Sequence, residues 1–227
     1  MESQDKLVII SRYQEDLEWV RKLDCSILIY NKDDKEYNEF PNFQIPNIGR
    51  ESETFIRGII DNYDILHQFE SITFLQGNPF EHCPDLYEKL EEKVLDYNFL
   101  SNNIQSYDLM SDLYINGTHL SIIHNLYGNQ LFWNVIMEVT GVDFNFSKIF
   151  EQIYSLCEIM DIKYKGINYQ WGHGAQYSVK PEFILSKSLN WWKELYRLLI
   201  YNYKNLNNQS FGYAMEKVWP LIWEHKT

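Results

Sequence analysis

The sequence predicts an α/β fold in which a mostly parallel sheet is flanked by helices and followed by a helical C-terminal part. Three short runs, at residues 6–11, 25–30 and 71–76, are apolar or β-branched without a helical period, which is typical of buried strands. Helical patterns separate these runs, so the order is strand, helix, strand, helix, strand. That order predicts adjacent parallel strands joined by right-handed crossovers.

The helices that join and cover these strands are predicted at residues 15–22, 51–63 and 84–96. The first has acidic residues at its start and basic residues at its end, which matches the helix dipole. The second follows a polar loop at residues 34–48 and carries an apolar stripe formed by Phe55, Ile56, Ile59, Ile60 and Tyr63. The third opens with a proline and carries Leu86, Leu90 and Val94 on one side.

The second half of the chain is predicted to be largely helical. Residues 97–145 lack a clean period, and we expect them to hold one or two strands and a helix near 129–139. The later patterns predict helices at 147–160, from Pro181, at 190–203 and at 211–223, with a strand at 175–179. Pro220 removes the usual hydrogen-bond donor for the carbonyl of Glu216, so the last helix should kink or end there.

Length and composition indicate a single domain, residues 1–227. A chain that is 45% hydrophobic, without an internal repeat or a linker, can bury one large core. The net charge of −12, without a cluster of Lys or Arg, argues against nucleic acid and against an anionic membrane surface as partners. The three cysteines fit neither a disulfide framework nor a zinc pattern. Because a signal-peptide pattern and a long apolar run are both missing, we expect a cytoplasmic protein without a membrane span.

The turn after the third predicted strand is the first place where the sequence indicates chemistry. Gly77 and Pro79 end the strand, and Glu81 and His82 follow within the segment ESITFLQGNPFEHCP. In open α/β sheets, ligands bind beyond the carboxyl ends of the strands. Glu81 and His82 can exchange protons or bind a cation there, although the pattern also fits a buried strand followed by an ordinary surface turn.

Polar residues also follow the other predicted strands. Arg12 follows the first strand, Asn31 the second and Gln76 the third. Arg50 and Glu51 lie where the second crossover helix begins, and helix N-termini favour anionic ligands. Because the carboxyl ends of parallel strands meet at one edge of a sheet, we expect Arg12, Asn31, Arg50 and Gln76 to converge on one cleft.

Three blocks, taken in order, resemble a known family. They read SRYQEDLEWV…ILIYNK, PNIGRESETFIRGIIDNYD…TFLQGNPFEH and GAQYSVKPEFIL…YAMEKVWPLIW, and they cover most of residues 6–82 and 172–223. The set resembles glycosyltransferase-like proteins of unknown function, found mostly in eukaryotes and large DNA viruses, and is similar to glycosyltransferases of the A type. The resemblance implies a Rossmann-like, glycosyltransferase-A-like fold. Residues 6–96 would be the nucleotide-binding half, and residues 97–227 the acceptor half with the C-terminal helices.

The resemblance implies a nucleotide sugar as donor and a glycan or another hydroxyl compound as acceptor. The donor site would be formed by Arg12, Tyr13, Asn31, Lys32, Arg50, Glu51, Gln76 and Asn78. Glycosyltransferases of the A type typically hold Mn²⁺ or Mg²⁺ through an Asp-x-Asp motif, which residues 76–82 lack. Metal use is therefore open: either Glu81 or His82 replaces a ligand, or the three cations of the donor set neutralise the diphosphate.

The same resemblance implies the acceptor side of the site. His173, which lies between two glycines, and Gln176 would contact the acceptor sugar. Glu216 resembles the late acidic residue that acts as general base in inverting members, and His173 would assist it. A positioned base contributes about 10²–10⁴-fold to the rate. Glu216 also fits an ordinary surface carboxylate on an amphipathic helix, with Lys217 and water beside it.

Three functions follow from these patterns. The leading hypothesis is a nucleotide-sugar-dependent glycosyltransferase. The alternative is a non-catalytic nucleotide- or glycan-binding domain, because the Asp-x-Asp motif is missing and a fold alone does not separate the two. A third is a metal-dependent hydrolase that uses Glu81, His82 and His173, but the sequence has no HExxH-type spacing.

Overall fold

The computed structural model describes residues 4–108, 159–162, 168–206 and 210–224. The helix predicted near 129–139 lies outside these ranges, as does nearly all of the helix predicted at 147–160.

The main sheet has six strands in the order β3-β2-β1-β4-β8-β5. The strands are β1 (Gln4–Arg12), β2 (Ser26–Asn31), β3 (Phe43–Gln44), β4 (Phe69–Gln76), β5 (Tyr97–Phe99) and β8 (Tyr177–Val179). β1 lies between β2 and β4 and is parallel to both, with Ile9 opposite Leu28 on one side and Phe74 on the other. β8 runs antiparallel to β4 and to β5. The predicted α/β class and the three adjacent parallel strands are therefore confirmed, within a mixed sheet.

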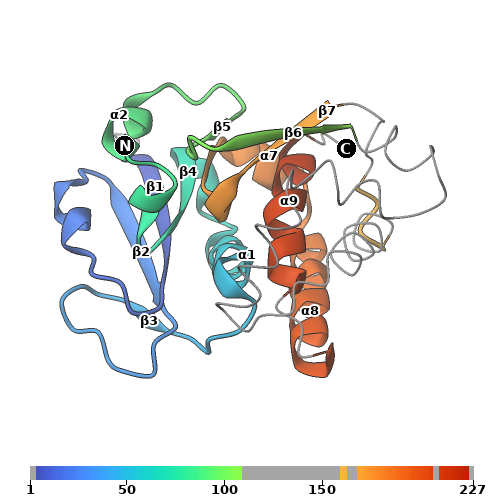
Figure 1. The fold of residues 1–227 in the computed structure, drawn as a ribbon, viewed down its shortest axis with the longest axis horizontal. Helices are drawn as coiled ribbons and strands as arrows, with labels where there is room; N and C mark the ends of the chain where they lie inside the picture. The colour runs from blue at the N-terminus through green and yellow to red at the C-terminus, as the bar shows by residue number, and fades with distance from the viewer. Residues whose placement is uncertain (1–3, 109–158, 163–167, 207–209, 225–227) are drawn as a thin grey trace, which may run out of the picture.

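The sheet is covered on both faces, because side chains alternate along β1. Leu7 and Ile9 pack in one apolar cluster, and Val8 and Ile10 in the other. The first cluster is covered by α1 (Arg50–Asn62), α7 (Pro181–Leu185), α8 (Leu189–Leu206) and α9 (Ser210–Glu224). The second is covered by α2 (Leu86–Glu91) and the short 3-10 helix η1 (Glu18–Lys22). Figure 1 shows α1, α8 and α9 together on one side of the sheet.

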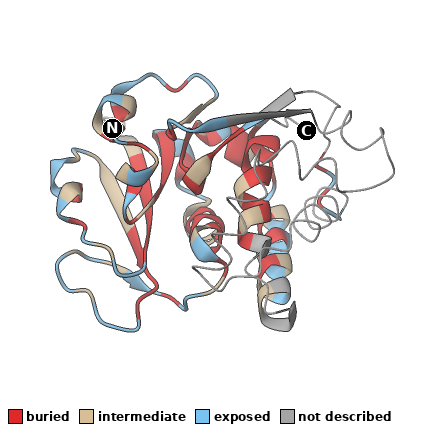
Figure 2. Cartoon of the chain, in the orientation of Figure 1, coloured by how far each residue is buried: buried red, intermediate tan, exposed pale blue. Residues whose placement is uncertain are grey.

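An aromatic stack joins α9 to the sheet. The rings of Trp219 and Trp223 are stacked with their centroids 5.0 Å apart, and Trp223 stacks on Phe74 of β4 at 5.9 Å. Trp192 of α8 lies 6.0 Å from Trp223, so both C-terminal helices meet at this point. Figure 2 shows the inner strands and much of α9 as buried. Such rings supply much of the apolar area that a core buries, and the stack fixes how α9 lies on the sheet.

Several predicted elements are shorter or longer than the sequence pattern indicated. The helix predicted at 15–22 is reduced to η1 because the preceding residues form turns, in which the Glu15 carboxylate accepts hydrogen bonds from the backbone N–H groups of Tyr13 and Gln14. The helix predicted at 84–96 is only α2, since Glu92 adopts an extended conformation.

Of the two outcomes predicted for Pro220, an end of the helix is wrong, because α9 continues through it to Glu224. The hydroxyl of Tyr177, at the start of β8, donates to the carbonyl of Glu216 at 3.3 Å. A side-chain donor thus replaces the N–H group that proline lacks, which removes one reason for the helix to end.

A second, two-stranded sheet leads into the candidate site. It pairs β6 (Ile104–Asp108) with β7 (Asn168–Gly172) in antiparallel fashion. β7 is followed at once by the 3-10 turn η4 (His173–Ala175) and then by β8, so the strand predicted at 175–179 begins two residues late. Ala175 has a φ of 51°, which lies outside the extended region. Among the helices of the described ranges, none has the length and apolar character that a membrane crossing requires.

Candidate active site

Three segments that are distant in the sequence meet beyond the end of β4. The turn η3 (Pro79–Glu81) and His82 come from the chain after β4, η4 comes from the chain before β8, and Glu216 comes from α9. The amide of Gln176 donates to the carbonyl of Pro79 at 3.2 Å, and the N–H of Gly174 donates to Glu216. A polar cluster therefore lies beyond the carboxyl end of β4, where the sequence predicted chemistry.

Glu216 is held by one hydrogen bond and one ion pair. Its Oε1 accepts a 2.7 Å hydrogen bond from the backbone N–H of Gly174, and its Oε2 lies 3.6 Å from Nζ of Lys217. Lys217 is itself only 4% exposed, donates to the carbonyl of Tyr213, and lies 4.0 Å from the ring centre of Trp171. The pair is thus not a solvated surface pair. Lys217 is a site residue that the sequence reasoning missed, and its signal was a cation on an otherwise apolar stretch of helix.

The pKa of His173 depends on its burial and on the nearby groups Glu216, Lys217 and His82. Burial lowers the pKa of His173, Glu216 opposes this shift, and Lys217 and His82 add to it. The centres of the two imidazole rings are 6.3 Å apart, and the ring of Trp171 lies 4.5 Å from that of His173. A histidine with a lowered pKa is neutral at neutral pH, so it can accept a proton or donate a hydrogen bond.

The N-terminus of α1 borders the same cluster. The guanidinium of Arg50 lies 4.4 Å from the ring centre of Tyr213, and its Nε lies 3.5 Å from the carboxylate of Glu51. Burial raises the pKa of Glu51, Arg50 opposes this shift, and Glu216 adds to it. The charge of Glu216 therefore makes ionisation of the Glu51 carboxyl less favourable. α9 approaches closely here because Gly212 has no side chain: a Cβ at that position would lie 2.8 Å from Cδ of Arg50.

The backbone is strained on both sides of the cluster. Arg50 and Ala175 have φ values of 53° and 51°, a region that residues other than glycine rarely adopt. Such strain persists only where the surrounding structure enforces it, and it gathers at functional sites.

Gln176 carries an unsatisfied polar atom at this point. The residue is fully buried, its amide nitrogen is bonded to Pro79, and its Oε1 has no hydrogen-bond partner among the described residues. The hydroxyl of Ser52, in the first turn of α1, is also buried and also has no hydrogen-bond partner among the described residues. Buried polar atoms are normally paired with protein or ordered water, and both of these atoms are enclosed by the surrounding structure.

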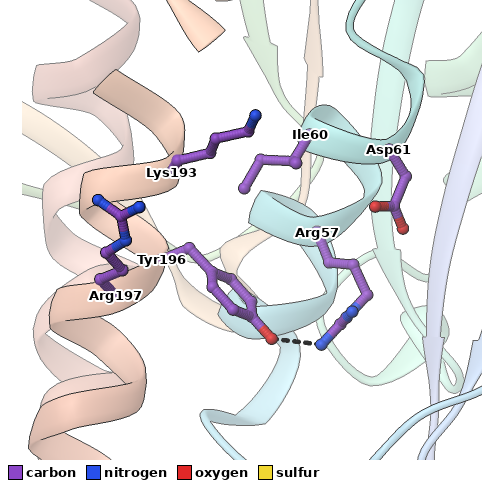
Figure 3. Close-up of a pocket in the computed structure, with 6 residues that line it drawn as sticks. All are labelled: Arg57, Ile60, Asp61, Lys193, Tyr196 and Arg197. Atoms are coloured by element: carbon purple, nitrogen blue, oxygen red, sulfur yellow. Dashed lines mark hydrogen bonds between the residues drawn. The ribbon is translucent and has the colours of Figure 1, made fainter. Parts of the chain in front are cut away.

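Lys32 belongs to a buried network rather than to this cluster. Its Nζ donates to Glu53 at 2.8 Å and to the carbonyl of Ile48 at 2.7 Å, and only 3% of the residue is exposed. Glu53 in turn binds Arg57, whose guanidinium donates to the hydroxyl of Tyr196, as Figure 3 shows. Burial lowers the pKa of Lys32, and Glu53 opposes that shift. Lys32 therefore ties the end of β2 to α1.

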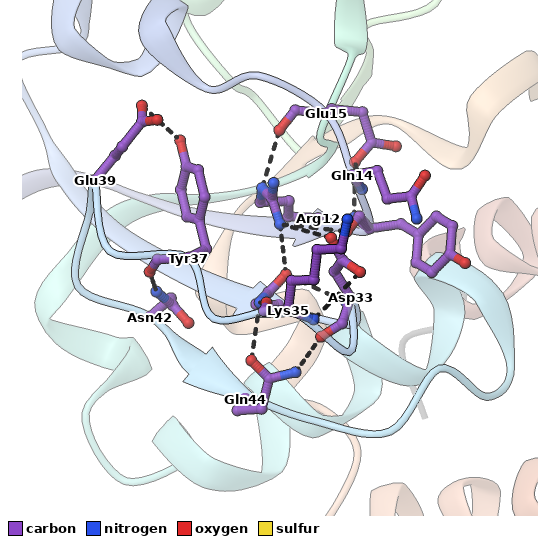
Figure 4. Close-up of polar contacts among 11 residues, drawn as sticks. Arg12, Gln14, Glu15, Asp33, Lys35, Tyr37, Glu39, Asn42 and Gln44 are labelled. Atoms are coloured by element: carbon purple, nitrogen blue, oxygen red, sulfur yellow. Dashed lines mark hydrogen bonds and ion pairs between the residues drawn. The ribbon is translucent and has the colours of Figure 1, made fainter.

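Arg12 and Asn31 bind each other. Nη1 of Arg12 donates to Oδ1 of Asn31 at 2.7 Å, and its guanidinium lies 3.8 Å from the ring centre of Tyr37 (Figure 4). The Asn31 amide nitrogen donates to Gln44 and to the carbonyl of Lys35, so both ends of this side chain are occupied. The structure joins Arg12 to Asn31, while Arg50 contacts Glu51 and Tyr213 instead.

The remaining predicted donor residues lie near the ends of β1 and β4. Tyr13 is 45% exposed, Asn78 is exposed, and Gln76 is half-buried. Gly77 lies between them, and a Cβ there would lie within 3.0 Å of the Glu15 carboxylate. The end of β4 is thus packed closely against the turn after β1, with the polar side chains at its surface.

A pocket beside the Arg12 network was missed by the sequence reasoning, which predicted only a loop. It has a volume of about 540 Å³ and lies around β3, and it is lined by Glu36, Tyr37, Asn38, Phe40, Pro41, Asn42 and Gln44. Aromatic rings and side-chain amides together can bind a flat heterocycle, by stacking and by hydrogen bonds to its edge. The signal in the sequence was the mixture of aromatic and amide residues at 36–44.

The candidate metal ligands form a sparse set. Glu81 is exposed and His82 is half-buried against Gly174, where a Cβ would meet the imidazole within 3.0 Å. Over the described ranges, no three His, Cys, Asp or Glu side chains come together as a metal-binding group.

Comparison with known proteins identifies the family. A family model described as "Protein of unknown function (DUF3431)" matches residues 7–227. No curated protein and no solved structure matches the chain significantly. Since the match spans nearly the whole chain and includes every segment of the site, this protein belongs to the DUF3431 family.

Proposed function

We propose that this protein is a nucleotide-sugar-dependent glycosyltransferase with Glu216 as its general base. The observation that carries the proposal is the position of the Glu216 carboxylate, held by the Gly174 N–H, beside His173 and near the N-terminus of α1. A fixed carboxylate such as Glu216 can take a proton from one substrate. The N-terminus of α1, with the cation Arg50, can stabilise the anion that the other substrate releases.

In the proposed reaction, the acceptor hydroxyl transfers its proton to Glu216 while its oxygen attacks the anomeric carbon. The bond from that carbon to the diphosphate oxygen breaks, and the nucleoside diphosphate leaves with the electron pair. A single displacement of this kind inverts the anomeric centre. His173 and Gln176 would position the acceptor, from the turn that also holds Glu216.

The donor diphosphate would bind at the first turn of α1, next to Arg50. Backbone N–H groups and the dipole favour an anion there, and Arg50 brings a full positive charge. The pocket around β3 is our candidate for the nucleoside, because its lining combines the aromatic residues Tyr37 and Phe40 with the side-chain amides of Asn38 and Asn42. The proposed chemistry assigns the diphosphate charge to Arg50 and α1, since Glu81 and His82 offer a hard cation a single carboxylate.

A non-catalytic binding domain is the second candidate. The observation that favours it is the pairing of Glu216 with Lys217, which occupies part of the carboxylate that a base must present to its substrate.

Two measurements test the proposal. The first is a thermal-shift panel of nucleoside diphosphates and nucleotide sugars, with and without Mn²⁺; a ligand at 100 times its Kd stabilises by about 2.7 kcal/mol. The second is a transfer assay that uses the best donor and a broad acceptor panel. Binding with transfer supports the glycosyltransferase, whereas binding without transfer or donor hydrolysis favours the binding domain. A panel without any binder would contradict the glycosyltransferase and a nucleotide-binding domain alike, and would leave a glycan-binding domain as the alternative.

A further inference from the structure

A separate pocket lies between α1 and α8, two turns along α1 from Arg50. Its volume is about 170 Å³, and it is lined by Arg57, Ile60 and Asp61 of α1 and by Lys193, Tyr196 and Arg197 of α8 (Figure 3). Carbon atoms form most of the lining. An apolar cavity of about 150 Å³ is large enough to hold benzene, so this pocket has room for one six-membered ring.

One wall of the pocket is held in place from inside the protein. The Arg57 guanidinium is bonded to Glu53 at 2.7 Å and to the Tyr196 hydroxyl, which itself donates to Glu53 at 3.1 Å. Glu53 is fully buried, and it also binds the buried Lys32. A ligand that binds here would not have to order these side chains, which lowers the cost of binding.

Two carboxylates lie close to Arg57. Its guanidinium pairs with the buried Glu53 at 2.7 Å, and Asp61 is the one carboxylate among the lining residues. The charge of Arg57 is therefore balanced from inside the protein.

The outer wall adds two further cations. Lys193 and Arg197 lie four residues apart on α8 and therefore on one face of that helix. Arg197 pairs with Glu194 on the surface, and Lys193 forms no ion pair with any residue that the structure describes. Lys193 is thus the lining cation without an ion pair among the described residues, and its charge can attract an anion.

We propose that this pocket is a second ligand site, which binds a small ring-shaped organic anion of the aromatic carboxylate class. The ring packs against Ile60 and the side of Tyr196, and the carboxylate lies at the rim near Lys193 and Arg197. A neutral ring leaves Lys193 without a counter-ion, and an inorganic anion leaves the carbon lining exposed to water. The ligand therefore needs both parts.

The test is a set of NMR titrations of the full chain at constant ionic strength. The probes are benzoate, its neutral isostere benzamide, and inorganic phosphate. We expect benzoate to shift the amide signals of residues around Tyr196, with a Kd on the order of 1 mM, and each of the other two probes to bind at least about tenfold more weakly.

Matched variants locate the site without disturbing the buried network. K193Q/R197Q removes two exposed cations from the pocket, and R21Q/K22Q removes two from η1, where Arg21 pairs with Glu18 as Arg197 does with Glu194. Benzoate should bind the first variant at least about fivefold more weakly than the second. Equal affinity for benzamide or phosphate, equal affinity of the two variants, or no saturation by about 20 mM benzoate would overturn the proposal.

Discussion

The backbone N–H of Gly174 donates a 2.7 Å hydrogen bond to Oε1 of Glu216, across 42 positions of sequence. Gly174 has a φ of 83°, and a Cβ at this position would run into the imidazole of His82. The bond therefore depends on a glycine in a left-handed conformation. It also fixes one oxygen of Glu216, so the proposed reaction would use the other oxygen, which lies 3.6 Å from Nζ of Lys217.

Glu216→Gln should remove the proposed base while keeping its size and its bond to Gly174. We expect kcat for sugar transfer to fall by about 10²–10⁴-fold, with little change in KM for the donor. Steady-state kinetics measure both constants. Glu182→Gln, on an exposed position of α7, is the control and should behave as wild type. Wild-type turnover in Glu216→Gln would eliminate this residue as base and direct attention to Glu81.

Arg50→Ala should weaken nucleotide binding and leave the fold intact. The Arg50 side chain is 40% exposed, so its removal takes away little of the packing in the core. A charged hydrogen bond contributes about 1.5–3 kcal/mol, which predicts at least about a tenfold rise in Kd by calorimetry. Arg197→Ala removes an exposed arginine from α8 and should leave Kd unchanged. Equal affinities of the two variants would count against the donor role of α1.

Two glycine substitutions should separate stability from binding. Gly174→Ala places a Cβ against His82 at a positive φ, so it should lower the free energy of unfolding by at least about 1–2 kcal/mol. Gly212→Ala meets only the movable side chain of Arg50 and gains helix propensity, so stability should change by less than about 1 kcal/mol.

Gly212→Ala should nevertheless displace Arg50 and weaken nucleotide binding. Denaturant unfolding and calorimetry together measure both effects. Similar losses of stability in the two variants would contradict this account of the contact between α1 and α9.

Tyr177 and Pro220 should be energetically coupled. Tyr177→Phe leaves the Glu216 carbonyl without its hydroxyl donor, at a cost of about 1–3 kcal/mol. Pro220→Ala restores an N–H group that can bond the same carbonyl, so Tyr177→Phe should cost less in that background. A double-mutant cycle from denaturant unfolding measures the difference. Additive effects would show that the hydroxyl does not replace the missing donor.

His173 should make stability depend on pH. Its pKa is lowered in the folded protein, so between that value and the unfolded value of about 6.5 the unfolded chain binds more protons. Its contribution to stability is therefore complete above about pH 6.5 and is lost as the pH falls through the folded pKa. His173→Asn should flatten this loss relative to wild type, and His67→Asn, at an exposed histidine, should not. Parallel curves for all three proteins between about pH 5 and 8 would contradict the prediction.

Only part of the candidate site could be predicted from the sequence. Glu216, His173 and Gln176 were predicted through the resemblance, and Arg50 and Glu51 from their place at a helix start; the structure brings all five around one cluster. The roles of Arg12 and Asn31 were not predictable. A polar residue after a strand is available to a ligand or satisfied by a neighbour, and here the neighbours are each other.

The sequence by itself determined the parallel centre of the fold, because continuous apolar runs such as residues 6–11 require a strand that is buried on both faces. It also determined α1, whose apolar stripe has a helical period. The tertiary structure alone decided that the three-residue strand β8 pairs antiparallel beside β4, and that Lys217 lies buried over Trp171. Both depend on contacts between residues far apart in the chain, and no local pattern encodes which distant partner a short strand or a lone cation will meet.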